Sequence, residues 1–180
     1  LVMGLEEGDY QGAMEACDSA LAIAQPTGDL ALEMRTLAYS STVDYWHLRW
    51  QGTVTKGLRV IELARRAEDQ LSEVSARFWV GVALLEIGES QTAQPHAAAM
   101  LSAAESLHDS YWLATALWLN EMVSSYQGDW QTAQDFNKRV SRFRRRTSVS
   151  WAPECYWSTR LAMGSRGMDT RDGLWSPCAR

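Results

Sequence analysis

Metal binding and acid–base catalysis are the first chemistry to look for, and few residues of the chain have the types and spacing for either. The three histidines, His47, His96 and His108, never stand three or four positions apart, so no helix brings two of them to one face as metal ligands. Neighbouring carboxylates such as Glu6 and Glu7 are typical of solvated helix ends. The sequence contains no phosphate-binding loop, no dinucleotide-binding glycine pattern and no HExxH zinc motif. We therefore expect no catalytic activity, no metal and no cofactor.

The cysteines and the apolar segments point to a compartment. Cys17, Cys155 and Cys178 are odd in number and far apart, so they form neither a disulfide framework nor a CxxC metal pair. Reduced thiols of this kind are typical of cytosolic proteins. No apolar stretch is long enough to span a membrane, and the first ten residues hold no targeting segment and no initiator methionine. We expect a cytoplasmic protein without a membrane partner, cut from a longer chain.

Charge is divided unevenly along the sequence. Residues 1–137 hold 7 Lys and Arg against 19 Asp and Glu, whereas residues 138–180 hold 10 against 3. A basic run at 138–146 can bind nucleic acid or an acidic lipid surface, or it can be a solvated helix end whose cations meet the helix dipole. No nucleic-acid motif surrounds the run, so the helix end is the preferred interpretation and polyanion binding is kept as an alternative. The basic residues concerned are Lys138, Arg139, Arg142, Arg144, Arg145 and Arg146.

A short phrase recurs along the chain as GDYQGA (8–13), GESQTA (88–93) and GDWQTA (128–133). In each, an alanine stands five positions after a glycine, and the glycines are Gly8, Gly88 and Gly128, so the first interval is twice the second. The missing copy is expected near position 48, where Gly52 is taken as its glycine and Gly57 as its small residue. The interval from Gly8 to Gly52 is then four residues longer than the interval from Gly88 to Gly128, and the interval from Gly52 to Gly88 is four residues shorter. We infer an insertion that is offset by an equal deletion.

The repeat predicts pairs of helices. Glycines end helices, and acidic residues such as Asp29 and Asp129 cap the next ones. The alanines allow two helices of a hairpin to approach closely. One hairpin cannot bury its own apolar side, whereas stacked neighbours can, so the sequence favours an all-α solenoid. The predicted helices cover residues 9–25, 29–49, 53–69, 71–87, 89–107, 109–127 and 129–145.

The residues of these phrases resemble tetratricopeptide repeats, in which glycine, an acidic residue, an aromatic residue and alanine follow in this order. GESQTA lacks the aromatic residue, and GTVTKG (52–57) keeps only the glycine and a small residue. The usual repeat has ~34 residues, whereas this one averages about 40 residues, a length also found in HEAT and armadillo arrays. The resemblance covers about residues 5–145 and implies a right-handed superhelical solenoid of antiparallel helix pairs. The longer repeat is similar to arrays in large bacterial LuxR-type ATP-dependent regulators and adenylate-cyclase-containing proteins, which implies a fragment of such a regulator.

Two parts of the chain are expected to differ in order. Residues 1–146 form the repeat domain, and residues 147–180 form an irregular, poorly ordered tail, because helical periodicity stops after Arg146. We interpret this tail as foreign to the array. The last repeat then has no polar cap, so self-association through it is a further expectation.

The functional prediction is a protein-interaction module that holds a partner protein or peptide in a concave groove. The groove is expected to be lined by the inner helices 29–49, 71–87 and 109–127, with Tyr39, Trp46, Arg49, Phe78 and Trp118 as candidate contacts. Each aromatic residue has core packing as its alternative role, and Asn120 is either a buried hydrogen-bonding group or a groove contact. A domain that senses a small effector and a nucleic-acid binder acting through residues 138–146 are the alternative functions.

Overall fold

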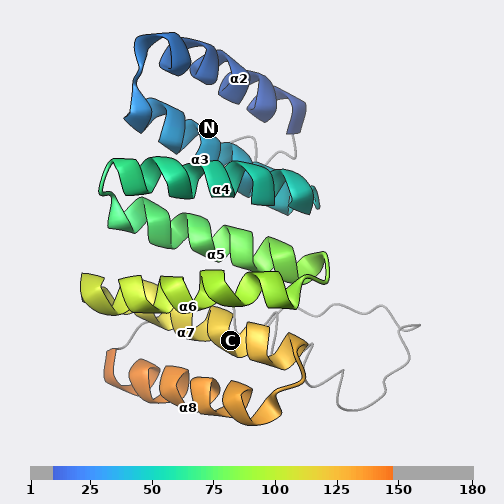
Figure 1. Cartoon of the computed structure of the whole chain (residues 1–180), viewed down its shortest axis with the longest axis vertical. Helices are drawn as coiled ribbons and strands as arrows, with labels where there is room; N and C mark the ends of the chain where they lie inside the picture. Colours follow the sequence, from blue (N-terminus) through green and yellow to red (C-terminus); the bar gives the residue numbers. More distant parts are fainter. Residues whose placement is uncertain (1–9, 148–180) are drawn as a thin grey trace, which may run out of the picture. The chain divides into compact units, whose positions relative to one another are not determined.

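The computed structural model describes the backbone of residues 10–147 and the side chains of residues 10–142. These residues form α-helices and no strand, which confirms the predicted all-α class (Figure 1). The predicted tail lies outside the described residues except for Thr147, so the boundary at residue 146 stays a prediction. In chain order the helices are α2 (Tyr10–Thr27), α3 (Leu30–Trp46), α4 (Trp50–Arg66), α5 (Gln70–Glu86), α6 (Ser90–Leu107), α7 (Ser110–Tyr126) and α8 (Trp130–Thr147).

Each helix packs against the next helix in the chain, and Figure 1 shows the helices following one another in sequence order. Further contacts join α3 to α5 and α5 to α7, so these three helices form one layer, which we call the A layer. The helices α2, α4, α6 and α8 alternate with them and are called the B helices. This sequential packing is consistent with a helical solenoid, in which every hairpin covers its apolar side with the next one.

The turns recur at a constant spacing. A residue with a positive φ, between 54° and 85°, stands at each of positions 28, 48, 68, 88, 108 and 128, in the left-handed conformation that ends a helix. Gly28, Gly88 and Gly128 adopt it without a steric cost, whereas Leu48, Glu68 and His108 adopt it although they carry side chains. Two successive turns make one repeat, so the repeat has the same length throughout the described chain.

The second repeat begins earlier than the glycine pattern predicted. The helix expected over 29–49 ends at Trp46, and α4 begins at Trp50 rather than at residue 53. Gly52 therefore lies inside α4, and the left-handed residue of this turn is Leu48, one full repeat before Gly88. The inferred insertion and deletion were wrong, because leucine holds the position that glycine holds in the later repeats.

The small residues of the hairpins are buried as expected. Ala93 and Ala133 are almost fully covered, and the equivalent residue one repeat before Ala93 is Thr53, which is also fully buried. Gly57, predicted for this role, instead marks a close approach between α4 and α5. A Cβ atom at Gly57 would lie 2.5 Å from the Cγ2 atom of Val80.

Aspartate caps hold the A layer helices at their starts. The side chains of Asp29, Asp69 and Asp109 accept hydrogen bonds from backbone N–H groups in the first turns of α3, α5 and α7. Asp129 caps α8 in the same way, through the N–H group of Thr132 at 3.1 Å. The predicted caps at residues 29 and 129 are confirmed.

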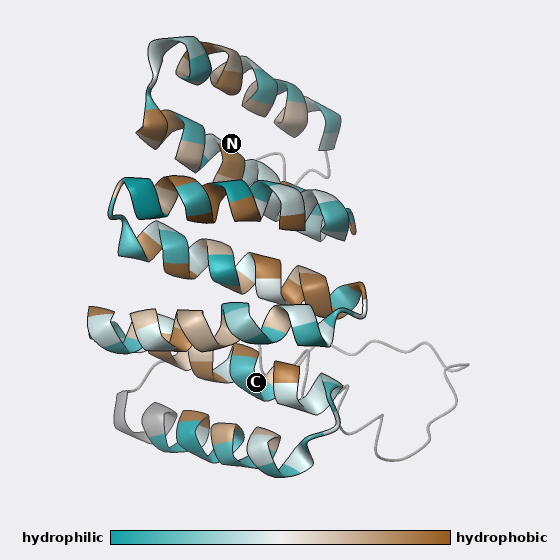
Figure 2. Cartoon of the chain, viewed as in Figure 1, coloured by the Kyte–Doolittle hydropathy of each residue, from teal (hydrophilic) through white to brown (hydrophobic). Residues whose placement is uncertain are grey.

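The core is deepest at α5, which is covered by α4, α6 and both neighbours in the A layer. Residues 80–85 of α5 are buried without a break, and Figure 2 shows hydrophobic bands along the packed helices. Gly81 brings α5 and α7 together, since a Cβ atom there would lie 2.8 Å from Leu119. Asn120 is only partly exposed and donates hydrogen bonds to the carbonyl oxygens of Ala97 and Ala116, which favours a packing role over a groove contact.

Candidate functional site

Aromatic rings from all three A-layer helices form one continuous series of contacts, which we call the aromatic row: Tyr45, Trp46, Phe78, Trp79 and Trp118. Trp79 lies at its centre, with its ring centroid 5.2 Å from Tyr45, 6.3 Å from Trp46 and 5.2 Å from Phe78. Phe78 in turn lies 5.8 Å from Trp118. Phe78 and Trp118 are one full repeat apart, so they occupy the same position in successive repeats and meet across α5 and α7.

The row has a covered base and accessible edges. Phe78 is 8% exposed, whereas Trp46 is 60% exposed, and the other three rings are half-buried. Large rings held in place by their neighbours bury apolar area on binding at a small entropic cost, and tryptophan and tyrosine are common binding hot spots. The row therefore presents preformed apolar edges to solvent, chiefly at Trp46.

A hollow of about 180 Å³ lies beside Trp79, between α3, α4 and α5. Small side chains leave this space open, among them Ala38 on α3 and Ser75 on α5, and Gly57 on α4 cannot be enlarged without displacing Val80. The complete lining consists of Ala38, Tyr39, Ser41, Thr42, Gly57, Val60, Ser75, Ala76 and Trp79.

Tyr39 contributes an unusual polar atom to this region. Its hydroxyl oxygen is buried and has no hydrogen-bond partner among the described residues. Burial raises the pKa of the Tyr39 hydroxyl, and the nearby Cys17 thiol adds to this effect. The hydroxyl is therefore neutral at physiological pH.

The structure distributes the predicted groove residues over two places. Trp46, Phe78 and Trp118 belong to the aromatic row, and Tyr39 lines the adjoining hollow. Arg49 lies at the turn between α3 and α4 and joins a different cluster. The sequence argument missed Trp79, the central ring, although it stands one full repeat after Tyr39 and so shares its position in the repeat.

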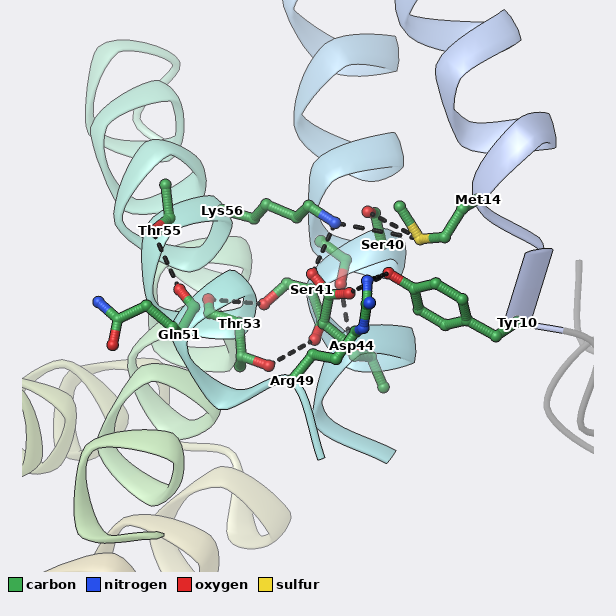
Figure 3. Close-up of polar contacts among 12 residues, drawn as sticks. Tyr10, Met14, Ser40, Ser41, Asp44, Arg49, Gln51, Thr53, Thr55 and Lys56 are labelled. Carbon is green, nitrogen blue, oxygen red and sulfur yellow. Dashed lines mark hydrogen bonds and ion pairs between the residues drawn. The ribbon is translucent and has the colours of Figure 1, made fainter. Parts of the chain in front are cut away.

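The second cluster, which we call the turn cluster, consists of Tyr10, Asp44, Arg49 and Lys56 (Figure 3). Asp44 is 3% exposed; it accepts a hydrogen bond from the Tyr10 hydroxyl at 2.9 Å and pairs with Lys56 at 2.6 Å. Arg49 donates to the Tyr10 hydroxyl at 2.9 Å and places its guanidinium 4.7 Å from the centre of the ring. Burial and the hydrogen bond to Asp44 raise the pKa of Tyr10.

The turn cluster explains Gly52. A Cβ atom at this position would fall on the carboxylate of Asp44, so only glycine lets the carboxylate lie against the first turn of α4. A negative charge is favoured at the N-terminus of a helix. Asp44 thus ties α2, through Tyr10, to α4, through Lys56, and its first role is structural.

A depression of about 580 Å³ opens beside the turn cluster. It combines the cationic side chains of Arg49 and Lys56 with an apolar rim that includes Leu48, Trp50 and Ile87. Leu48 is 70% exposed, so this rim is presented to solvent. The other lining residues are Tyr10, Asp44, Gln51 and Gly52.

A third ionic cluster lies within the packed helices. Glu73 accepts hydrogen bonds from Arg77 on its own helix at 2.7 Å and from Arg65 on α4 at 3.0 Å. The Nη1 atom of Arg77 lies 3.5 Å from Nδ1 of His96 on α6. Burial lowers the pKa of His96, and the two arginines lower it further. Because Arg77 is 5% exposed, this cluster stabilises the packing of α4, α5 and α6 rather than forming an open site.

The basic run begins on α8. Lys138 pairs with Asp135 at 3.0 Å, and Arg139 pairs with Glu105 of α6 at 3.3 Å. Arg142 donates to the carbonyl oxygen of Lys138 at 3.3 Å. The side chains of Arg144, Arg145 and Arg146 lie outside the described residues, so polyanion binding by the run stays a prediction.

The chain was compared with protein-family models and with curated proteins, and no match was found in either comparison. Among residues 10–147, none of the helices has both the length and the apolar character needed to cross a bilayer. The same part of the chain holds no group of three His, Cys, Asp or Glu side chains placed to bind a metal ion.

Proposed function

We propose that the chain is a protein-interaction module built from tetratricopeptide-like repeats, which binds an extended peptide segment of a partner along the aromatic row. The right-handed superhelix of this family, with the A layer on its concave side, is part of the proposal. This proposed arrangement of the repeats is supported by the constant spacing of the turns and by the contacts of α3 with α5 and of α5 with α7. The proposed setting, a cytoplasmic bacterial regulator, follows from the sequence resemblance.

The aromatic row is the observation that carries the proposal. Five rings from three successive repeats contact one another in series. A ligand lying across the A layer would meet the exposed Trp46 and the half-buried Tyr45, Trp79 and Trp118, while the buried Phe78 connects Trp79 to Trp118 from below. The hollow beside Trp79 can receive one side chain of the ligand as an anchor. An extended segment places alternate side chains on the same surface, which suits a row with one hollow at its side.

The size of the hollow favours a peptide over a small effector. At about 180 Å³ it is smaller than the ~300–1,000 Å³ of pockets that enclose drug-sized ligands. One aliphatic side chain fits such a volume, and the rest of a peptide would remain on the row.

A peptide library displayed on phage and selected on the immobilised chain tests the proposal. Ser75→Leu fills the hollow from α5 and should reduce binding of selected peptides at least tenfold. Ser102→Leu, an equal change at an exposed position of α6, is the matched control and should leave binding unchanged. The proposal fails when no peptide is enriched, or when selected peptides bind the Ser75→Leu protein as well as the parent.

A further inference from the structure

The turn between α3 and α4 departs from the repeat at two successive positions. Leu48 adopts a φ of 60° where later repeats have Gly88 and Gly128. Arg49 then stands where the later repeats have an acidic residue, Glu89 or Asp129, although Glu89 also starts its helix without a side-chain cap. A bulky residue in the left-handed conformation disfavours the fold, and sites that break local rules in this way are often functional.

The departures create an open surface of mixed chemistry. Leu48 exposes its side chain at the rim of the depression, beside Trp50 and Ile87. Arg49 is exposed, and no carboxylate among the described residues lies within ion-pair distance of its guanidinium. Lys56, which also lines the depression, keeps a quarter of its side chain exposed although it pairs with Asp44 (Figure 3).

We propose that this depression is a second docking site, which binds a partner segment that carries an acidic side chain next to a large apolar one. The carboxylate pairs with the fork of Arg49, and the apolar side chain covers Leu48 and Trp50. Charge complementarity selects this occupant, since Arg49 has no ion-pair partner among the described residues, and Asp44, the one carboxylate of the lining, is already bound by Lys56 and Tyr10.

The openness of the surface favours a polypeptide segment over a free small acid. Leu48, 70% exposed, stands at the edge of the site and can be covered only by a ligand that extends beyond the depression. The site is separate from the aromatic row, because none of its nine lining residues belongs to the row. Either proposal can therefore fail without the other.

The test follows backbone amide resonances of the ¹⁵N-labelled full chain during titration with a blocked peptide of alternating aspartate and leucine around one tryptophan. The expected result is saturable shifts at Leu48, Gly52 and Ile87. The same peptide with lysine for aspartate should bind at least tenfold more weakly. The proposal is overturned when the acidic peptide causes no shift at millimolar concentration, or shifts only residues of the aromatic row.

Two variants separate binding from folding. Leu48→Gly restores the residue type of the later repeats, so this variant should fold well. It should nevertheless bind the acidic peptide at least fivefold more weakly than the parent protein. Glu68→Gly makes the same backbone change at the α4–α5 turn and should leave binding unchanged. Equal affinity for the parent and Leu48→Gly proteins would overturn the proposal.

Other occupants give distinct results in the same experiment. Shifts of Leu48 and Gly52 on dilution of the free protein would show that a second copy fills the site. Shifts of Leu48 and Gly52 in a Glu6→Lys and Glu7→Lys variant without peptide would show that the chain's own acidic residues occupy the site. Either result overturns the proposal of a partner segment.

Discussion

Replacing Leu48 by glycine should stabilise the protein, although the change removes a large apolar side chain. The left-handed conformation costs a residue with a side chain about 1–2 kcal/mol, and glycine pays about 0.5–1 kcal/mol in extra chain entropy. Leu48 is 70% exposed, so little buried surface is lost. The net gain is about 0.5–1 kcal/mol, which corresponds to a rise in melting temperature of about 1–4 °C for a domain of this size.

The assay is thermal and urea unfolding followed by circular dichroism, with two companion variants. Glu68→Gly has the same left-handed backbone, with a φ of 55°, and should gain a similar amount. Ala98→Gly changes an exposed position inside α6 and should lose about 1 kcal/mol, the usual cost of glycine in a helix. A loss of stability in Leu48→Gly equal to that in Ala98→Gly would refute the placement of the turn at residue 48, because it would mean that residue 48 is helical.

Three further predictions concern buried groups. Gly52→Ala should cost about 3 kcal/mol, because the new methyl group displaces the buried Asp44 carboxylate from its partners Tyr10 and Lys56. Gln51→Ala at the exposed neighbouring position should change stability by less than about 0.5 kcal/mol, and urea unfolding of both variants decides this. Burial raises the pKa of Glu121 in the folded state, so its charge costs stability above the unfolded-state pKa. Glu121→Gln should therefore stabilise the protein at pH 7 by on the order of 1 kcal/mol, and the gain should shrink as the pH falls below about 4, because both states then take up the proton. A constant gain at every pH would show that the carboxyl is solvated. Burial and the neighbouring arginines lower the pKa of His96 in the folded state, so the unfolded chain takes up the proton first and stability should fall as pH drops below about 6.5. His96→Gln should remove this part of the pH dependence of stability. Identical pH profiles of stability for the parent and the His96→Gln protein would contradict the reasoning.

The helices could be predicted from sequence wherever local chemistry marks their ends. Gly28 with Asp29, and Gly128 with Asp129, combine a left-handed residue with a cap, and the predicted boundaries there lie within two residues of the observed ones. At the α3–α4 turn Leu48 supplies neither signal, and the nearby Gly52 was taken for the turn. The glycine at position 52 is required instead by the Asp44 carboxylate, a tertiary contact that no local pattern reveals.

The sequence indicated which helices supply the candidate site, but not which of their side chains form it. The helices that were expected to line a groove, over 29–49, 71–87 and 109–127, correspond to α3, α5 and α7, which supply the aromatic row, and three of the row's rings were named from sequence. Trp79 and Tyr45 were missed because adjacent residues on a helix point about 100° apart, and only the packing of α3 against α5 shows that both rings of each neighbouring pair, Tyr45 with Trp46 and Phe78 with Trp79, join the row. Arg49 joined Tyr10 instead, through a contact between segments far apart in the sequence.

The packing of successive A-layer helices through the aromatic row is the central claim, and nuclear Overhauser effects between labelled rings test it most directly. Cross-peaks from Trp79 to both Trp46 and Phe78, and from Phe78 to Trp118, are the predicted result. Direct cross-peaks between Trp46 and Trp118, without those to Trp79, would place the first and last rings around one common centre. That result would contradict the stacked arrangement and the extended docking surface with it.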